Sequence, residues 1–336
     1  MRIESMKRFV MVSLALIIAF GSLLIPFDTK KAYASDEFDV LREKYVETLI
    51  GPSTYSLTDT DITDRVTEIT NRAQELWDTM YTDVNRSKLW PYYHIGYNYP
   101  EHTWYTYLNL VDMAKAYRTY GSPLMGDTDL RDAIIGGLDW MHDNNYYAGS
   151  TSTGSNWWSK EVGDALALND LVALMYDDLT QTQIDENVAA VNSFQNDIDM
   201  TGANRMWEVK VCAIAAILGK NIVPAGTTLA DARDGISAFL PYVTKGDGFY
   251  IDGSFIQHNY IAYTGGYGAS FISSLAEMLY LLDGSTWEVV DLGIANVYTW
   301  IYDAYEPFIY KGNFMDTVRG REISRHYEED NVTSGH

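Results

Sequence analysis

Residues 246–268 read GDGFYIDGSFIQHNYIAYTGGYG, and this is the most unusual stretch of the chain. It holds six glycines, four tyrosines and one histidine, His258, which lies nine residues before Tyr267. Glycines at this density let the backbone adopt positive φ angles and approach a ligand closely, at a cost in conformational entropy. We therefore expect a functional loop here. An aromatic-rich loop that closes the core is the alternative interpretation.

Elsewhere the apolar residues recur at helical spacing and almost never alternate, which predicts an all-α domain. The connecting segments carry glycine, proline and asparagine, as turns do. Helices of this length with such connectors are typical of antiparallel helix pairs arranged in a ring or superhelix. The predicted helices span residues 62–80, 104–117, 130–142, 166–179, 205–218, 229–240, 269–282 and 297–305.

Residues 1–34 have the pattern of a secretory signal peptide. A basic start precedes an apolar run from Phe9 to Phe27, and small residues place the expected cleavage before Ser35. An uncleaved membrane anchor is the alternative. The single cysteine, Cys212, rules out intrachain disulfides, and its apolar neighbours predict a buried thiol.

The chain is strongly acidic, with a formal net charge of −22. Loss of the signal segment, with its five basic and two acidic side chains, would make this −25. Such a surface repels nucleic acid and anionic membranes, so we expect neither as a partner of the processed protein. We expect a secreted monomer.

Aromatic residues make up 14% of the sequence, and many lie in predicted loops, where flat rings suit sugar faces. Asn156, Trp157 and Trp158 follow a polar loop at the start of a helix. Adjacent tryptophans point to different sides of a helix, so at least one is expected to line a cleft. Packing of both rings in the core is the alternative.

Two further motifs carry polar groups suited to an anion. Asn204 precedes a predicted helix, and the local sequence favours it as the N-cap over an amide that donates to a substrate carboxylate. Arg321 and Arg325 lie four residues apart, on one face if this segment is helical, and guanidinium groups bind carboxylates in bidentate fashion. Pairing of this basic cluster with Asp316 and Glu322 is the alternative.

The sequence gives little indication of a metal or cofactor. The six histidines are scattered without the spacing of a zinc site. No nucleophile elbow or phosphate-binding glycine loop is present. We expect no metal ligands and no cofactor.

Four motifs together resemble the polysaccharide lyase family that includes hyaluronate, chondroitin AC and xanthan lyases. In order, they are NWWSKEVG from Asn156, TGANR from Thr201, the stretch 246–268, and YKGNFMDTVRGREISR from Tyr310. The resemblance covers 35–336 and implies an incomplete (α/α) toroid, which in the family precedes β-sandwich domains that are absent from these 336 residues. It is strongest toward the xanthan-cleaving members.

The resemblance also implies roles for individual residues. Asn204, His258, Tyr267 and Arg321 match the family's catalytic positions. Substrate-binding positions are matched by Asn156, Trp157, Trp158, Arg325 and Tyr327.

The implied reaction is β-elimination at a glucuronic acid in an acidic polysaccharide, with the mannosyl–glucuronate bond of xanthan as the expected target. Asn204 and His258 would neutralise the carboxylate. Tyr267, assisted by Arg321, would remove the C5 proton and then protonate the leaving oxygen. Hyaluronan and chondroitin are alternative substrates. A glycoside hydrolase that uses Asp247 and Asp252, or a non-catalytic sugar-binding fragment, are the rival functions.

Overall fold

The computed structural model of the chain describes residues 36–94, 99–150, 156–221 and 226–324. The expected signal segment lies outside these residues, so its prediction remains untested. From Glu37 onward the chain forms one compact unit. Across the described ranges, no helix is both long and apolar enough to cross a membrane.

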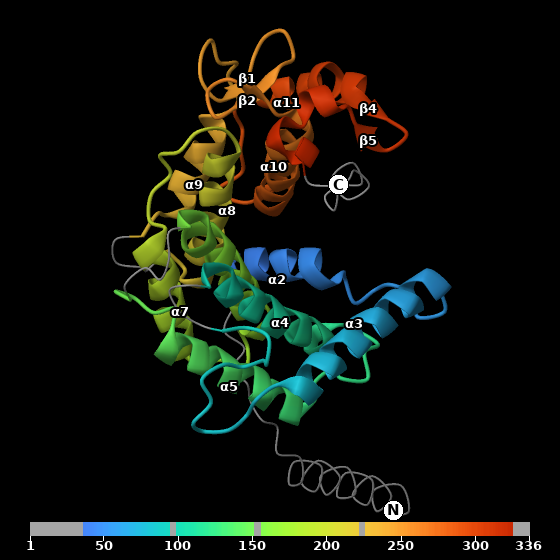
Figure 1. Cartoon of the computed structure of the whole chain (residues 1–336), viewed down its shortest axis with the longest axis vertical. Helices are drawn as coiled ribbons and strands as arrows, with labels where there is room; N and C mark the ends of the chain where they lie inside the picture. Colours follow the sequence, from blue (N-terminus) through green and yellow to red (C-terminus); the bar gives the residue numbers. More distant parts are fainter. Residues whose placement is uncertain (1–35, 95–98, 151–155, 222–225, 325–336) are drawn as a thin grey trace, which may run out of the picture. The chain divides into compact units, whose positions relative to one another are not determined.

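The compact unit is built mainly of α-helices, which confirms the predicted all-α class (Figure 1). Periodicity located most helices to within a few residues, but it missed α2 and α7. The helices are α2 (Glu37–Ile50), α3 (Thr60–Thr79), α4 (Pro100–Arg118), α5 (Thr128–Asn144), α6 (Asp164–Met175), α7 (Gln181–Phe194), α8 (Gly202–Leu218), α9 (Leu229–Ser237), α10 (Ala269–Leu282) and α11 (Ile294–Trp300).

Several helices begin where the sequence supplies a capping side chain. Asp59 and Asp127 accept backbone N–H groups of the first turns of α3 and α5. Thr180 and Thr228 complete capping boxes at α7 and α9. Each such cap stabilises its helix by about 1 kcal/mol, because it satisfies donors that the helix itself cannot pair.

The helices form two layers. Helices α4, α6, α8 and α10 pack in succession, each against the next, and α3, α5, α7 and α9 pack against members of this inner row. This is the incomplete (α/α) toroid of antiparallel pairs. Helix α8 is buried along most of its length, including Cys212, as predicted; burial raises the pKa of this thiol to about 12.

Helix α2 contacts all four members of the inner row (Figure 1). Its buried residues include Arg42, whose guanidinium lies 4.2 Å from the centre of the Tyr176 ring. Tyr45 is 1% exposed and donates a hydrogen bond to Asp170. At the start of α2, Glu37 accepts a hydrogen bond from Thr286, and in its middle Lys44 donates to the carbonyl of Asp283.

The stretch 246–268, expected to be a loop, contains a small three-stranded antiparallel sheet in the order β1-β2-β3. Its strands are β1 (Gly248–Phe249), β2 (Phe255–Gln257) and β3 (Ile261–Ala262), too short for alternation to be recognised in the sequence. A second pair, β4 (Ile309–Tyr310) and β5 (Asn313–Phe314), lies near the end of the described chain.

Short π-helical turns interrupt the regular helices at three places: η1 (Ser159–Gly163), η2 (Thr264–Gly268) and η3 (Ile301–Tyr305). Such turns are rare and occur often at functional sites. Both η1 and η2 contribute residues to the cavity described next, as does the short 3-10 helix η6 (Gly320–Ser324).

Candidate active site

One cavity of about 700 Å³ brings together most of the predicted site residues. It lies where the first turns of α4 and α8 meet the segment before η1, the turn after β2, η2 and η6. Its lining consists mainly of aromatic rings and polar side chains, which is typical of a site for a hydroxyl-rich ligand. The predicted residues that line it are Asn156, Trp157, Trp158, Asn204, His258, Tyr267 and Arg321.

The glycine-rich stretch supplies two of these side chains. After β2, His258 and Asn259 adopt left-handed φ angles of 55° and 70°, which turn the chain toward β3. This conformation is uncommon for residues with a side chain, and it persists where surrounding contacts enforce it, often at functional sites. The chain then enters η2, where Tyr267 lines the same cavity.

Gly266 allows η2 and η6 to approach each other closely. A Cβ atom at this position would lie 1.8 Å from Oε2 of Glu322 and 2.5 Å from the ring of Tyr263. No larger side chain fits without a shift of these neighbours. The close approach lets Tyr267, which follows Gly266, contact Arg321, which precedes Glu322.

Tyr267 and Arg321 form the central contact of the cavity. Nη2 of Arg321 donates to the hydroxyl of Tyr267 over 2.9 Å, and the guanidinium carbon lies 5.7 Å from the ring centre. The imidazole of His258 meets the same ring nearly edge-on, with centroids 5.0 Å apart. The hydroxyl of Tyr267 therefore has a cationic hydrogen-bond donor beside it in the cavity, and its ring packs against the imidazole.

A second tyrosine supports the first without facing the cavity. Tyr263 is fully buried, and its ring centre lies 4.8 Å from that of Tyr267. Burial, followed by the negative charge of Glu322, raises the pKa of Tyr263 to about 12. Tyr263 therefore stays neutral near pH 7 and acts as packing.

The position of Asn204 shows that one prediction made from local sequence, its role as a helix N-cap, is wrong. The N-cap of α8 is Thr201, so Asn204 lies within the first turn of the helix and is not the cap. The difference arises because the apolar pattern becomes regular only after Asn204, whereas the helix itself begins at Gly202. Among the described residues, Oδ1 of Asn204 and Nε2 of His258 are buried atoms without a hydrogen-bond partner. Both residues line the cavity, where a bound ligand can satisfy such groups.

Four tryptophans also line the cavity. The Trp158 ring meets Trp104 and Trp207 edge-on, at centroid distances of 5.3 and 5.8 Å. We call these three residues the aromatic wall. Trp157 differs: it is 39% exposed, and no ring contact to another described residue involves it. Its face is therefore open to a ligand.

The basic residues of the predicted cluster do not all line one cavity. Arg321 lines the cavity, whereas Arg319 is buried and pairs with Asp316 at 3.4 Å, as in the alternative interpretation. Arg325 and Tyr327 lie outside the described residues.

The two aspartates of the hydrolase alternative do not line the cavity. Asp252 is exposed and accepts a hydrogen bond from the backbone of Ser254. Asp247 accepts hydrogen bonds from three other residues. A pair of carboxylates flanking a glycosidic bond is therefore not formed by these two residues.

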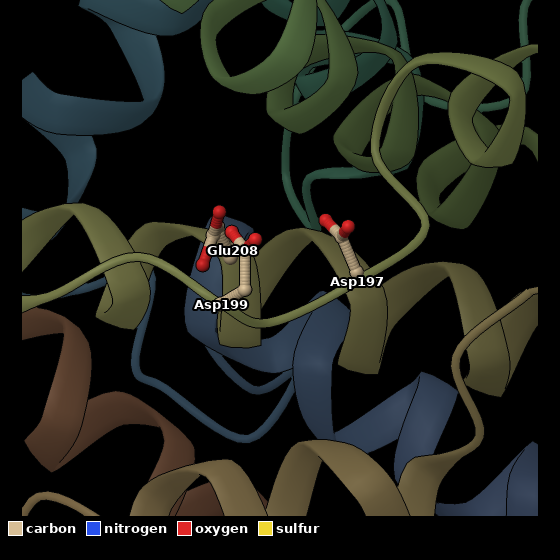
Figure 2. A group of neighbouring side chains, drawn as sticks. All are labelled: Asp197, Asp199 and Glu208. Carbon is tan, nitrogen blue, oxygen red and sulfur yellow. The ribbon is translucent and has the colours of Figure 1, made fainter.

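One carboxylate cluster escaped the sequence analysis. Ligand atoms of Asp197, Asp199 and Glu208 lie within 4.8 Å of one another, and Figure 2 shows the three side chains together. Carboxylate oxygens are ligands that calcium and magnesium prefer. Burial raises the pKa of Glu208 to about 7, and its Oε2 accepts the backbone N–H of Met200. The cluster does not belong to the cavity lining.

The cavity also contains residues that sequence reasoning missed: Glu101, Trp104, Tyr105, Trp207 and Ser270. Trp207 donates from its ring nitrogen to Ser270 over 2.9 Å. The only available signal was its spacing, since Trp207 lies three residues after Asn204 on α8 and therefore near it on the helix surface.

Comparison with known proteins gives a consistent result. Residues 45–336 match the family described as polysaccharide lyase family 8, N-terminal alpha-helical domain. Xanthan lyase of Bacillus sp. strain GL1 is 41% identical over 307 residues, and hyaluronate lyase of Thermasporomyces composti is 37% identical over 317 residues. The solved structure of Paenibacillus xanthan lyase superposes with a TM-score of 0.83 and 53% identity over 89% of this chain.

These relatives are much longer than the present chain. The matches cover 91% and 92% of this chain but only 32% of the Bacillus lyase and 39% of the Thermasporomyces lyase. They cover 28% of the solved Paenibacillus chain.

Proposed function

The chain belongs to polysaccharide lyase family 8, and from this premise we propose that it acts in the β-elimination of an acidic polysaccharide at glucuronic acid. Xanthan is the expected substrate because the Bacillus and Paenibacillus relatives are xanthan lyases. Hyaluronan and chondroitin are the alternatives. The signal-like segment at residues 1–34 supports a secreted protein.

The first chemical requirement is a more acidic C5 proton. The carboxylate next to C5 must lose its negative charge, so that charge from the breaking C–H bond can move onto it. Asn204 and His258 are the groups proposed to hold this carboxylate. In support, each has a buried polar atom without a partner in the described structure, and both line one cavity.

The second requirement is a base that can also act as an acid. The Tyr267 oxygen would take the C5 proton while the C–H electrons form the C4–C5 double bond and the C4–O bond breaks. The same oxygen would return the proton to the leaving glycosidic oxygen. Arg321 would stabilise negative charge on the tyrosine during this exchange. Their 2.9 Å hydrogen bond is the observation that best supports the proposal.

The sugar ring needs a surface that orients it. The open face of Trp157 is suited to this role because indole faces pack against the apolar sides of sugars. Asn156 and Trp158 adjoin it in the cavity. Arg325 and Tyr327 are proposed substrate contacts on family similarity alone.

A panel of xanthan, hyaluronan and chondroitin tests the proposal. Elimination leaves a conjugated double bond that absorbs in the near ultraviolet, and the polymer that yields it fastest is the substrate. Tyr267→Phe should lower this rate at least about 100-fold, since general acid–base catalysis contributes about 10² to 10⁴. Tyr298→Phe is the matched control, because Tyr298 is 66% exposed and lies outside the cavity lining.

The products separate this proposal from its rivals. New reducing ends without near-ultraviolet absorbance would indicate hydrolysis. Binding of a polymer without any product would indicate a carbohydrate-binding fragment. Equal rates for the wild type and Tyr267→Phe would remove Tyr267 from the mechanism.

A further inference from the structure

A hydrogen-bond network joins the two segments that carry Asn204 and His258. These segments are distant in sequence: one is the start of α8, and the other is the turn after β2. Asp247, just before β1, lies between them without lining the cavity. Its carboxylate needs an explanation, because a negative charge near a site for an anionic sugar opposes binding.

Each oxygen of Asp247 is used. Oδ1 accepts the backbone N–H of Asn259 over 2.6 Å, immediately after His258. Oδ2 accepts from the hydroxyl of Thr201 over 2.9 Å and from the amide nitrogen of Gln257 over 3.0 Å. One side chain thus holds both segments.

Gln257 completes the connection. It is 1% exposed, and its Oε1 accepts the backbone N–H of Ala203 over 3.0 Å, next to Asn204. Gly202 makes room for it, because a Cβ atom at this position would lie 2.1 Å from Oε1 of Gln257. The left-handed φ of 59° at Gly202 is a second reason for glycine at this position, because glycine adopts such angles readily.

We propose that Asp247 and Gln257 are positioning residues that fix Asn204 relative to His258, so that both reach the same substrate carboxylate. This inference rests on the proposed function, since it assigns the network a purpose in that reaction. The left-handed backbone of His258 and Asn259 fits the same role: the bond from Asn259 to Asp247 holds a conformation that residues with a side chain seldom adopt.

Two substitutions alter the network without removing volume. Asp247→Asn keeps the shape, but its NH₂ group cannot accept the hydrogen bonds that one carboxylate oxygen accepts. Gln257→Glu keeps an acceptor for Ala203 but sets a second carboxylate against Asp247. This pair can be joined by a hydrogen bond only when it holds a proton.

Turnover measures the effect on the reaction. For Asp247→Asn we expect kcat to fall about 100-fold with KM within about threefold, because a displacement of about 1 Å in a catalytic group has such an effect. For Gln257→Glu we expect a similar loss at pH 8 and substantial recovery of kcat at pH 5, relative to the wild type at each pH. Asp252→Asn is the control, since this exposed carboxylate of the same stretch lies outside the cavity lining and accepts a hydrogen bond from Ser254, and its kcat should match the wild type.

Hydrogen exchange measures the network independently of activity. In Asp247→Asn, the amides of residues 201–204 and 257–260 should both exchange faster, while those of α5 stay unchanged. Thr201→Val, which removes one of the three bonds to Asp247, should give a smaller change in the same segments and serves if Asp247→Asn does not fold.

The outcomes are separable. Faster exchange in only one of the two segments would overturn the coupling, and so would a loss of kcat in Gln257→Glu that does not depend on pH. If the wild type yields no unsaturated product, the proposed function fails, and the exchange data alone decide whether the network joins the two segments.

Discussion

The aromatic wall and the polar residues near it are held by different physical means. The aromatic wall consists of rings packed edge-on, at centroid distances of 5.3 and 5.8 Å around Trp158. What we call the polar wall, residues 200–204, 208, 247 and 257–259, supplies Asn204 and His258 to the same cavity, and in it side-chain oxygens accept specific backbone N–H groups. Ring packing depends on volume and tolerates changes in pH, whereas the polar wall depends on direction and on charge.

The largest effect should come from removing volume in the aromatic wall. Trp158→Ala should lower the free energy of unfolding by about 3–4 kcal/mol, because it leaves a cavity between Trp104 and Trp207. Gly163 also packs tightly there, since a Cβ atom on it would lie 2.9 Å from the Trp158 ring. Denaturant unfolding measures the change, and a loss below about 1 kcal/mol would show that the wall is not a packed unit.

The polar wall should respond to pH through Glu208, which holds the backbone of Met200. Burial raises the pKa of Glu208 from 4.5 to about 7, so the folded state binds the proton more tightly than the unfolded state does. The free energy of unfolding should therefore fall as pH rises from about 4.5 to about 7, by up to about 3 kcal/mol, and level off above. Denaturant unfolding at a series of pH values measures this change, and the free energy of unfolding of Glu208→Gln should depend less on pH than that of the wild type. Identical pH profiles for the two proteins would contradict this assignment.

A third test concerns the close approach of η2 and η6. Gly266→Ala places a methyl group against Glu322 and Tyr263, and we expect a loss of about 1–3 kcal/mol in stability together with reduced turnover. Gly136→Ala is the matched control, because nothing lies within 4 Å of its Cβ position in α5. It should be neutral or stabilise by up to about 1 kcal/mol. Similar melting temperatures for the two variants would argue against tight packing at Gly266.

The smallest change in stability is expected at the exposed tryptophan. Trp157→Ala should alter the free energy of unfolding by less than about 1 kcal/mol but raise KM about tenfold, because its 39% exposed ring contributes to the ligand surface more than to the core. Trp158→Ala, at the adjacent position, provides the contrast, because it should lower the free energy of unfolding much more. If Trp157→Ala destabilised the fold as strongly, the two tryptophans would share one structural role.

Much of the fold could be predicted because the outer helices bury an apolar face and the inner helices α6 and α8 are apolar along most of their length. Helix α2 was missed although Leu41 and Tyr45 are spaced as in a helix, because the charged Arg42 lies among its buried residues and interrupts the apolar stripe. In α7, Asn187 and Asn192 lie among the buried residues and obscure the pattern in the same way. The strands of the glycine-rich stretch were too short to detect.

The site was predictable only in part. Asn204, His258, Tyr267 and Arg321 were named from family resemblance, because no local pattern relates residues so far apart in sequence. Local reasoning alone favoured Asn204 as a helix cap, since it could not anticipate that Gly202 would start α8 earlier. The network around Asp247 could not be predicted for a similar reason: its carboxylate accepts from one backbone N–H and two side chains, and these groups come together only through the left-handed backbone at Gly202, His258 and Asn259.

The central place of α2 has a consequence for the order in which the chain folds. Glu37 bonds to Thr286, a residue 249 positions later, and Lys44 reaches Asp283. At synthesis rates of about 5–20 residues per second, these partners appear roughly 10–50 s after α2. During that interval Leu41, Tyr45 and Val46 lack part of the surface that finally covers them. The first helix of the described residues is thus among the last to be completed, and its apolar side chains stay partly uncovered while the polypeptide is still growing.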